Sequence, residues 1–308
     1  MTALDRSSSG VAAIGLVVHP TRDVERPLSA VREWARERGV ALGQVDSFGS
    51  RRPLGPAAEV ADCDLVVAIG GDGTTLAAIR AAAPAARPVL GVACGSLGAL
   101  TAVPAGEVGG ALERFARGDW VSRSIPALRV TAGSGARLAA YNDLAVVRAG
   151  PGQLRVTARV DGVLYARMAG DGCIVSTPAG SSAYTIASGG PLLAPALRAY
   201  VLTGLPRHGG FSPPLVLDAD STLELDVQSG HGGARLELDG RAVDEPAREL
   251  TVAFDADAAL LVAFSDQEPH LTGLRRRGIV ADSPRIVADD ARYAEAAGSS
   301  SSAQELMQ

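Results

Sequence analysis

Short apolar runs alternate with helical patterns in the first part of the chain. The apolar runs at 11–20, 64–71 and 87–95 are continuous, which is typical of strands buried on both faces of a sheet. Apolar residues recur at helical spacing over 28–39, 74–83 and 107–120. Buried strands separated by helices predict an α/β domain with a parallel sheet over residues 11–123.

From residue 124 onward the pattern changes to alternation of apolar and polar positions. Segments such as ALRVTA, QLRVTARV and ARLELDG alternate with a period of two and are separated by glycine or aspartate turns. Few helical patterns intervene, so residues 124–265 predict a β-rich second domain. We expect a flexible N-terminus at 1–10, a return segment at 266–281 and a disordered tail at 282–308, where apolar periodicity is lost.

Composition limits the chemistry more than the fold. The chain is 47% hydrophobic and 20% charged, and no apolar run is long enough to span a bilayer, so we expect a cytoplasmic protein without membrane contact. A net charge of −5 argues against general nucleic-acid binding. All 29 basic residues are arginine, so phosphate groups must be bound by backbone N–H groups, arginine or a metal ion.

A glycine turn between a buried strand and a helix is the first candidate site. In VVAIGGDGTTLA (66–77), Gly70, Gly71 and Gly73 allow positive φ or close approach of a ligand to the backbone. A helix beginning near Thr74 directs its unpaired N–H groups to the same place, which suits an anion. A carboxylate at Asp72 would repel phosphate unless it faces Mg²⁺ or a hydroxyl that loses a proton, which favours phosphoryl transfer. The structural alternative is an aspartate that only caps the helix.

A second cluster of small and polar residues lies about a hundred positions later. The stretch AGDGCIVSTPAGSSAYTIASGGPLLAP (169–195) places Asp171 between two glycines, before a strand and a loop of serines. The Asp171 carboxylate can accept hydrogen bonds from ribose hydroxyls or an amide, and Tyr184 can stack on a base. The structural alternative is a tight turn with structural serines.

These two stretches together resemble the NAD kinase family. GGDGT is also found in lipid kinases and, more distantly, phosphofructokinases, but the second stretch resembles the NAD kinase pattern GDGxIVSTPTGSTAYxxSAGGP. Three further segments fall in the family's order, namely GVACGSLGALT (91–101), YNDLAVVR (141–148) and LDG (238–240). The resemblance covers residues 11–265 and implies the two-domain fold of that family.

The resemblance implies a role for each candidate residue. Asp72 would take the proton from the adenosine-ribose 2′-hydroxyl of NAD, and the phosphates would lie against the glycine turn. The dinucleotide would be bound by the second domain. The residues implied in binding are Gly70, Gly71, Gly73, Thr74, Asn142, Asp143, Asp171, Ser182, Ala183, Tyr184 and Ala187.

The resemblance also implies substrates and assembly. Mg²⁺ would enter with ATP or inorganic polyphosphate as phosphoryl donor, and the family's members are homo-oligomers, so a dimer or tetramer is expected. The three cysteines and four histidines show no metal-ligand spacing, so we predict no metal site built from side chains.

Several family positions are changed in this chain. An asparagine, an aromatic residue, a glutamate and a serine of the family pattern are replaced by Ala93, Ala99, Asp143 and Ala187. These changes keep open a non-catalytic NAD(P)-binding paralogue as an alternative to NAD kinase. A lipid or other alcohol kinase with the same glycine turn is the second alternative.

Overall fold

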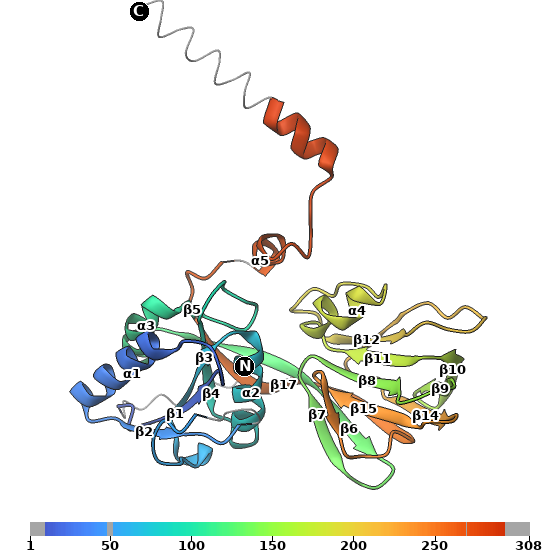
Figure 1. Cartoon of the computed structure of the whole chain (residues 1–308), viewed down its shortest axis with the longest axis horizontal. Helices are drawn as coiled ribbons and strands as arrows, with labels where there is room; N and C mark the ends of the chain where they lie inside the picture. The colour runs from blue at the N-terminus through green and yellow to red at the C-terminus, as the bar shows by residue number, and fades with distance from the viewer. Residues whose placement is uncertain (1–9, 48–51, 269, 293–308) are drawn as a thin grey trace, which may run out of the picture. The chain divides into compact units, whose positions relative to one another are not determined.

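The computed structural model describes residues 10–47, 52–268 and 270–292 (Figure 1). The chain divides into a large unit that ends at Gln267 and a C-terminal unit that begins at Glu268. Most of the predicted flexible N-terminus and the end of the predicted tail, 293–308, lie outside the described residues.

The first part of the large unit is a parallel sheet covered by helices (Figure 1). Neighbouring strands pair in the order β2-β1-β3-β4, and each of these pairs is parallel. The strands are β1 (Ala13–Val18), β2 (Ala41–Gln44), β3 (Leu65–Gly70), β4 (Pro88–Ala93) and the short β5 (Val103–Pro104), and the helices are α1 (Glu25–Arg38), α2 (Asp72–Ala82) and α3 (Val108–Ala116). The predicted α/β fold class is confirmed for this part.

Strand β3 has two apolar faces, as its unbroken hydrophobic run predicts. Leu65, Val67 and Ile69 pack into a core with α1 and α3, whereas Val66 and Ala68 pack into a second core with α2. All six residues of β3 are buried. The strand therefore ends at a fixed position between two cores, and the glycine turn that follows it has a rigid base.

The second part of the large unit consists of antiparallel strands in two sheets. One sheet has the order β13-β12-β11-β8-β15-β16, and the other contains β10, β9, β14, β17, β6 and β7. A core that includes Leu144, Tyr200 and Leu225 lies between them. The strands are β6 (Val121–Ala132), β7 (Arg137–Ala140), β8 (Asp143–Arg148), β9 (Leu154–Val160), β10 (Val163–Gly170), β11 (Gly172–Ser176), β12 (Ala199–Gly204), β13 (Leu215–Asp218), β14 (Leu223–Ser229), β15 (Ala234–Leu238), β16 (Arg241–Val243) and β17 (Glu249–Ala263). The predicted β-rich part is confirmed.

The two parts share one continuous sheet. Strand β17 pairs antiparallel with β14 and β6, and its residues Leu260 and Leu261 pair in parallel with β4. The register of β17 against β6 shifts between Asp255 and Ala259, where the strand passes from its pairing with β14 to its pairing with β4. The predicted boundary at residues 123 and 124 lies inside β6, so the chain crosses between the two parts within strands.

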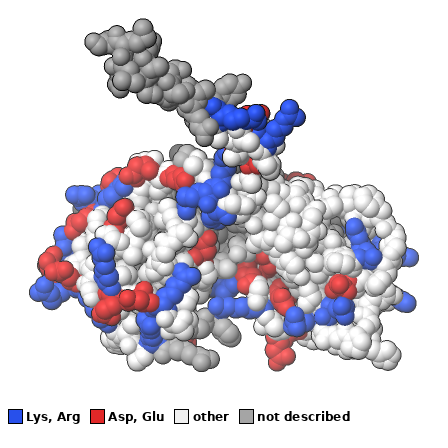
Figure 2. Space-filling model, turned by 45° about the horizontal axis from the view of Figure 1, so that its top comes forward, with Lys and Arg blue, Asp and Glu red and all other residues white. Residues whose placement is uncertain are grey.

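The C-terminal unit begins with the short helix α5 (His270–Arg276). Residues 284–292 are also helical, although we expected the segment from 282 to be disordered. In the described part of the chain, every helix is too short or too polar to cross a bilayer. On the face shown in Figure 2, arginine and acidic side chains are interspersed, in contrast to the basic stripe typical of nucleic-acid binding.

Candidate functional site

The glycine turn joins β3 to α2 without any left-handed residue. Helix α2 begins at Asp72, and Gly71 before it is extended, with φ of −149°. Neither Gly70 nor Gly73 is among the described glycines with positive φ. Gly70 is required for another reason, because a Cβ there would lie 2.2 Å from the Thr74 hydroxyl oxygen. The glycine at this position lets the first turn of α2 pack directly on the end of β3.

The Asp72 carboxylate is held by the loop that follows β4. Its two oxygens accept hydrogen bonds from the backbone N–H groups of Ala99 and Leu100, each at 2.9 Å. A Cβ at Gly98 would lie 2.0 Å from the nearer carboxylate oxygen. The N-cap of α2 is Gly71, so the alternative in which Asp72 only caps the helix is wrong. Both oxygens are oriented by another part of the chain, which fixes where they can accept a proton.

Arg123 supports the same loop from β6. Its guanidinium donates a hydrogen bond of 2.8 Å to the carbonyl oxygen of Ala99. Burial lowers the pKa of the Arg123 guanidinium, and the negative charge of Asp72 partly opposes this shift. The loop that binds the carboxylate is therefore held by a cation whose charge acts on Asp72.

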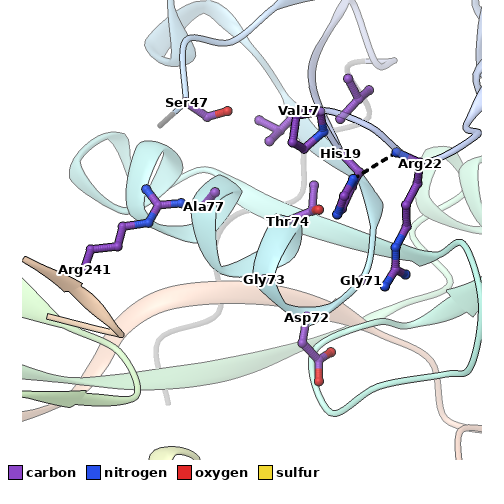
Figure 3. Close-up of a pocket in the computed structure, with 12 residues that line it drawn as sticks. Val17, His19, Arg22, Ser47, Gly71, Asp72, Gly73, Thr74, Ala77 and Arg241 are labelled. Atoms are coloured by element: carbon purple, nitrogen blue, oxygen red, sulfur yellow. Dashed lines mark hydrogen bonds between the residues drawn. The ribbon is translucent and has the colours of Figure 1, made fainter. Parts of the chain in front are cut away.

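A pocket of about 410 Å³ opens at the first turn of α2 (Figure 3). His19 Nδ1 accepts hydrogen bonds from the N–H groups of Thr21 and Arg22, and burial lowers the pKa of this imidazole. The Arg22 guanidinium donates to the carbonyl oxygen of Cys94 at 3.1 Å. Figure 3 shows Arg22 beside Gly71 at the helix start and Arg241 farther along α2, near Ala77. Together the lining residues present N–H groups and two guanidinium groups, which suits an anionic ligand. The pocket is lined by Val17, Val18, His19, Pro20, Arg22, Ser47, Gly71, Asp72, Gly73, Thr74, Ala77 and Arg241.

The serine loop after β11 is largely built from its own hydrogen bonds. Ser181 is buried, donates to the carbonyl oxygen of Pro178 at 2.7 Å and accepts from the N–H of Leu193 at 2.9 Å. Ser182 donates to the carbonyl oxygen of Ala179 at 3.0 Å. The hydroxyls of Ser181 and Ser182 therefore stabilise the turn, as the structural alternative predicted.

The part of this loop that faces outward lines a larger pocket. Tyr184 is 39% exposed and, with Ala187 and Asp171, lines a pocket of about 700 Å³. The Asp171 carboxylate accepts a hydrogen bond of 2.6 Å from Arg148 Nε. Asp171 also lines a neighbouring pocket of about 610 Å³ with Arg148. A ligand hydroxyl at Asp171 would therefore share this carboxylate with Arg148.

Asn142 and Asp143 lie at the start of β8, beside the DG turn. Residues Asp239 and Gly240 have φ of 49° and 72° and join β15 to β16 as a two-residue hairpin turn, the arrangement that Asp-Gly favours. The Asp239 carboxylate accepts hydrogen bonds from the N–H groups of Asn142 at 2.6 Å and Asp143 at 3.2 Å. The carbonyl oxygen of Asn142 accepts from the N–H of Thr177 at 2.9 Å. The backbone at Asn142 is thus fixed from two sides.

Asp143 is a buried carboxyl next to other acids. It is 6% exposed, and burial raises its pKa to about 6, with smaller contributions from Asp239 and Glu237. The folded protein therefore keeps this carboxyl protonated at pH values where the unfolded chain has lost the proton. The resulting stability is complete below pH about 4 and is lost as the pH rises through about 6.

Replacement of Asp143 by asparagine should remove this pH dependence. Between pH 4.5 and pH 7.5 the wild type should lose about 2 kcal/mol of stability that Asp143→Asn keeps, so the variant should become more stable relative to wild type by that amount. Urea unfolding at both pH values measures the difference. Asp220→Asn, at an exposed position, is the control and should show no such change. A wild-type stability that rises from pH 4.5 to 7.5 relative to Asp143→Asn would contradict the assignment.

The structure places seven of the predicted residues at two pockets. Gly71, Asp72, Gly73 and Thr74 line the pocket at α2, whereas Asp171, Tyr184 and Ala187 line the pocket at the serine loop. The other predicted residues are also described by the structure but line neither of these two pockets, namely Gly70, Asn142, Asp143, Ser182 and Ala183. Three groups were missed as site residues, namely Arg148, Asp239 and the Arg22–Arg241 pair. Of these, only Asp239 had a signal in the sequence, because it belongs to a DG dipeptide between segments that alternate apolar and polar residues.

The described residues contain no group of three or more histidine, cysteine or acidic side chains that could hold a metal ion. Asp72 is the carboxylate nearest to the helix start in the pocket, and its oxygens already accept two N–H groups. These residues fit a Mg²⁺ ion that takes most of its ligands from phosphates and water.

Family models match nearly the whole of the large unit. The ATP-NAD kinase N-terminal domain matches residues 14–120, and the ATP-NAD kinase C-terminal domain matches residues 121–258. The NAD kinase of Heliobacterium modesticaldum is 36% identical over 219 residues, which cover 68% of this chain and 77% of that protein. NAD kinase 1 of Streptomyces coelicolor is 30% identical over 325 aligned positions, covering 91% and 89%.

Solved structures share the fold. Yeast NADH kinase complexed with NADH has a TM-score of 0.71 at 19% identity, with 89% of this chain and 91% of that chain covered. An NAD kinase from Archaeoglobus fulgidus in complex with ATP has a TM-score of 0.69 at 23% identity, with 87% and 100% covered. The sequence resemblance is confirmed by both family models, and the chain belongs to the NAD kinase family.

Proposed function

We propose that this protein is an NAD kinase that transfers a phosphoryl group from ATP or inorganic polyphosphate to the adenosine-ribose 2′-hydroxyl of NAD. The observation that carries the proposal is the Asp72 carboxylate, oriented by two N–H groups at the edge of a pocket with two arginines. A carboxylate oxygen has about two acceptor sites, so Asp72 can accept a hydroxyl proton while it keeps both N–H bonds.

The reaction follows from this placement. The 2′-hydroxyl gives its proton to Asp72, and its oxygen forms a bond to the terminal phosphorus of the donor. The bond from that phosphorus to the bridging oxygen breaks, and ADP, or the shortened polyphosphate, leaves with the electron pair. Arg22, Arg241 and the N–H groups at the start of α2 would bind the donor phosphates, since the chain has no lysine.

The dinucleotide would be held by the β-rich part. Tyr184, Ala187 and Asp171 line one pocket there, and we propose that this pocket takes part of NAD. Asn142 and Asp143 would contact the adenosine ribose, with Ser182 and Ala183 next to the base. Gly70, Gly71, Gly73 and Thr74 would lie against the phosphates.

Mg²⁺ and assembly complete the proposal. Mg²⁺ bound to the donor would neutralise phosphate charge, with few ligands from the protein.

We further propose a homo-oligomer, a dimer or tetramer, in the cytoplasm, where ATP and NAD are both available. Phe211 is 86% exposed in the single chain, which is compatible with a contact between copies. Light scattering on the purified protein measures the assembly.

An assay with several donors tests the function and its donor. Purified protein is incubated with Mg²⁺, NAD or NADH, and ATP or polyphosphate, and NADP or NADPH is measured. We expect product from at least one donor. A protein that binds NAD in calorimetry but forms no product with any donor would instead be the non-catalytic paralogue.

A further inference from the structure

One buried carboxylate connects the phosphate helix to the strand that carries Asn142. Asp239 has a fully buried side chain, and its Oδ2 accepts hydrogen bonds from Arg80 Nε at 3.0 Å and Nη2 at 2.9 Å. Its Oδ1 accepts the N–H groups of Asn142 and Asp143. Four N–H donors from two distant segments therefore converge on a single side chain.

Arg80 belongs to the same helix as Asp72. The two residues are eight positions apart in α2, about 12 Å along the helix axis. The helix is rigid because its residues from Thr74 to Ile79 are buried against the sheet. Any displacement of Arg80 relative to the β-rich part therefore moves the Asp72 end of α2 as well.

The DG turn holds the start of β8 from the other side. The N–H of Asp239 donates to the carbonyl oxygen of Asp143 at 2.8 Å, so the turn both donates to and accepts from this strand. Thr177 holds the carbonyl oxygen of Asn142, and a Cβ at Gly180 would lie 2.0 Å from that same oxygen. The backbone of Asn142 thus has a fixed position relative to Asp239 and to the serine loop.

We infer that Arg80 and Asp239 are positioning residues for phosphoryl transfer, because their ion pair sets the distance between Asp72 on α2 and the NAD-binding start of β8. This inference rests on the proposed function. Neither Arg80 nor Asp239 lines the donor pocket, although that pocket extends along α2 as far as Ala77 and includes Arg241 of the same hairpin as Asp239. Loss of the ion pair should lower kcat more than it weakens substrate binding, since a shift of about 1 Å in reacting groups can reduce the rate about 100-fold.

Three single variants at the pair, the double variant Arg80→Met with Asp239→Asn, and one control test the inference. Arg80→Met removes the cation, and Asp239→Asn keeps an acceptor for the N–H of Asn142 while it removes the charge. Arg80→Lys keeps the positive charge without the planar guanidinium. Arg129→Met is the control, because Arg129 forms an equally short pair with Asp255, at 2.7 and 2.9 Å, between β6 and β17.

We measure kcat, the KM for NAD and for the donor, and the number of NAD sites by calorimetry. We expect Arg80→Met and Asp239→Asn to lower kcat per NAD site by about 10- to 100-fold, with both KM values within about threefold of wild type. Arg80→Lys should recover part of the loss. The double variant should lose no more than the worse single variant, since the two residues act together. Arg129→Met should stay within about twofold of wild type.

Hydrogen exchange gives a readout that needs no activity. The amides of Asn142 and Asp143 should exchange faster in Arg80→Met than in Arg129→Met. Unchanged exchange, or an unchanged kcat per NAD site in Arg80→Met, would overturn the inference while leaving the proposed function intact. A wild-type protein that forms no product overturns the proposed function, and with it the catalytic role of the pair.

Discussion

Replacement of Asp72 by asparagine should lower kcat for NADP formation by about 10²- to 10⁴-fold, the range typical of a lost general base. The amide oxygen can still accept one of the two N–H groups, from Ala99 or Leu100, but its NH₂ group cannot accept the other. NAD binding, measured by calorimetry, should change by less than about threefold, because the proton is transferred only during the reaction.

The chain offers a matched control for this variant. Asp64 also accepts two backbone N–H groups, from Ala12 and Ala13 at 2.7 and 3.0 Å, outside the pocket at α2. Both N–H groups reach the same oxygen, Asp64 Oδ2, so an amide oxygen there can still accept both, and Asp64→Asn should keep kcat per NAD site near wild type. An Asp72→Asn protein that retains more than a tenth of the wild-type kcat would contradict the role of Asp72 as base.

Replacement of Gly98 by alanine should have the second largest effect. The new Cβ would lie 2.0 Å from Asp72 Oδ1 and 2.4 Å from its Cγ, so the carboxylate or the loop has to move. We expect a loss of about 100-fold in kcat, because a displacement of about 1 Å is enough to misplace the base. Steady-state kinetics of NADP formation measure the loss.

Gly109→Ala is the control for the added methyl group. Gly109 lies in α3, and nothing is within 4 Å of the position of its Cβ. Alanine there should stabilise the protein by up to about 1 kcal/mol and leave kcat unchanged. A Gly98→Ala protein with kcat within about threefold of wild type would show that the loop does not need to approach Asp72 so closely.

The sequence was sufficient to predict the elements that depend on local patterns. The unbroken apolar run of β3 predicted a strand buried on both faces, and the helical spacing at 28–39 predicted α1, which ends at Gly39 in the left-handed conformation. It was not sufficient to predict the path of β17. The pairing of Leu260 with Pro88 depends on contacts between positions far apart in the chain, which no local pattern records.

The contacts that organise the site were less predictable than the site residues. Ala99 and Leu100 bind Asp72 through backbone N–H groups, which every residue except proline carries. Arg80 and Asp239 are 159 positions apart, and the pattern of α2 gives no sign that one of its arginines pairs with a turn in the β-rich part. The glycine turn was predicted to use positive φ or close approach to the backbone. Gly70 serves close packing against Thr74, whereas a Cβ at Gly73 would have nothing within 4 Å, and neither residue has positive φ.

The departures from the family pattern have different structural consequences. Ala99 replaces an aromatic residue, but its contact with Asp72 is made by the backbone and does not depend on the side chain. Asp143 replaces a glutamate and is 6% exposed, so its shorter side chain stays buried beside Asp239. The hydrogen bonds that orient Asp72 are thus present in spite of the changed neighbours, which favours the kinase over the non-catalytic alternative.

The most direct test is the identity of the product formed from NAD and MgATP by the wild-type protein. The account predicts ADP and an equal amount of NADP that carries its phosphate on the adenosine-ribose 2′ position, as shown by ³¹P NMR and by reaction with an NADP-specific dehydrogenase. ADP without NADP, or a phosphate on another hydroxyl, would contradict it.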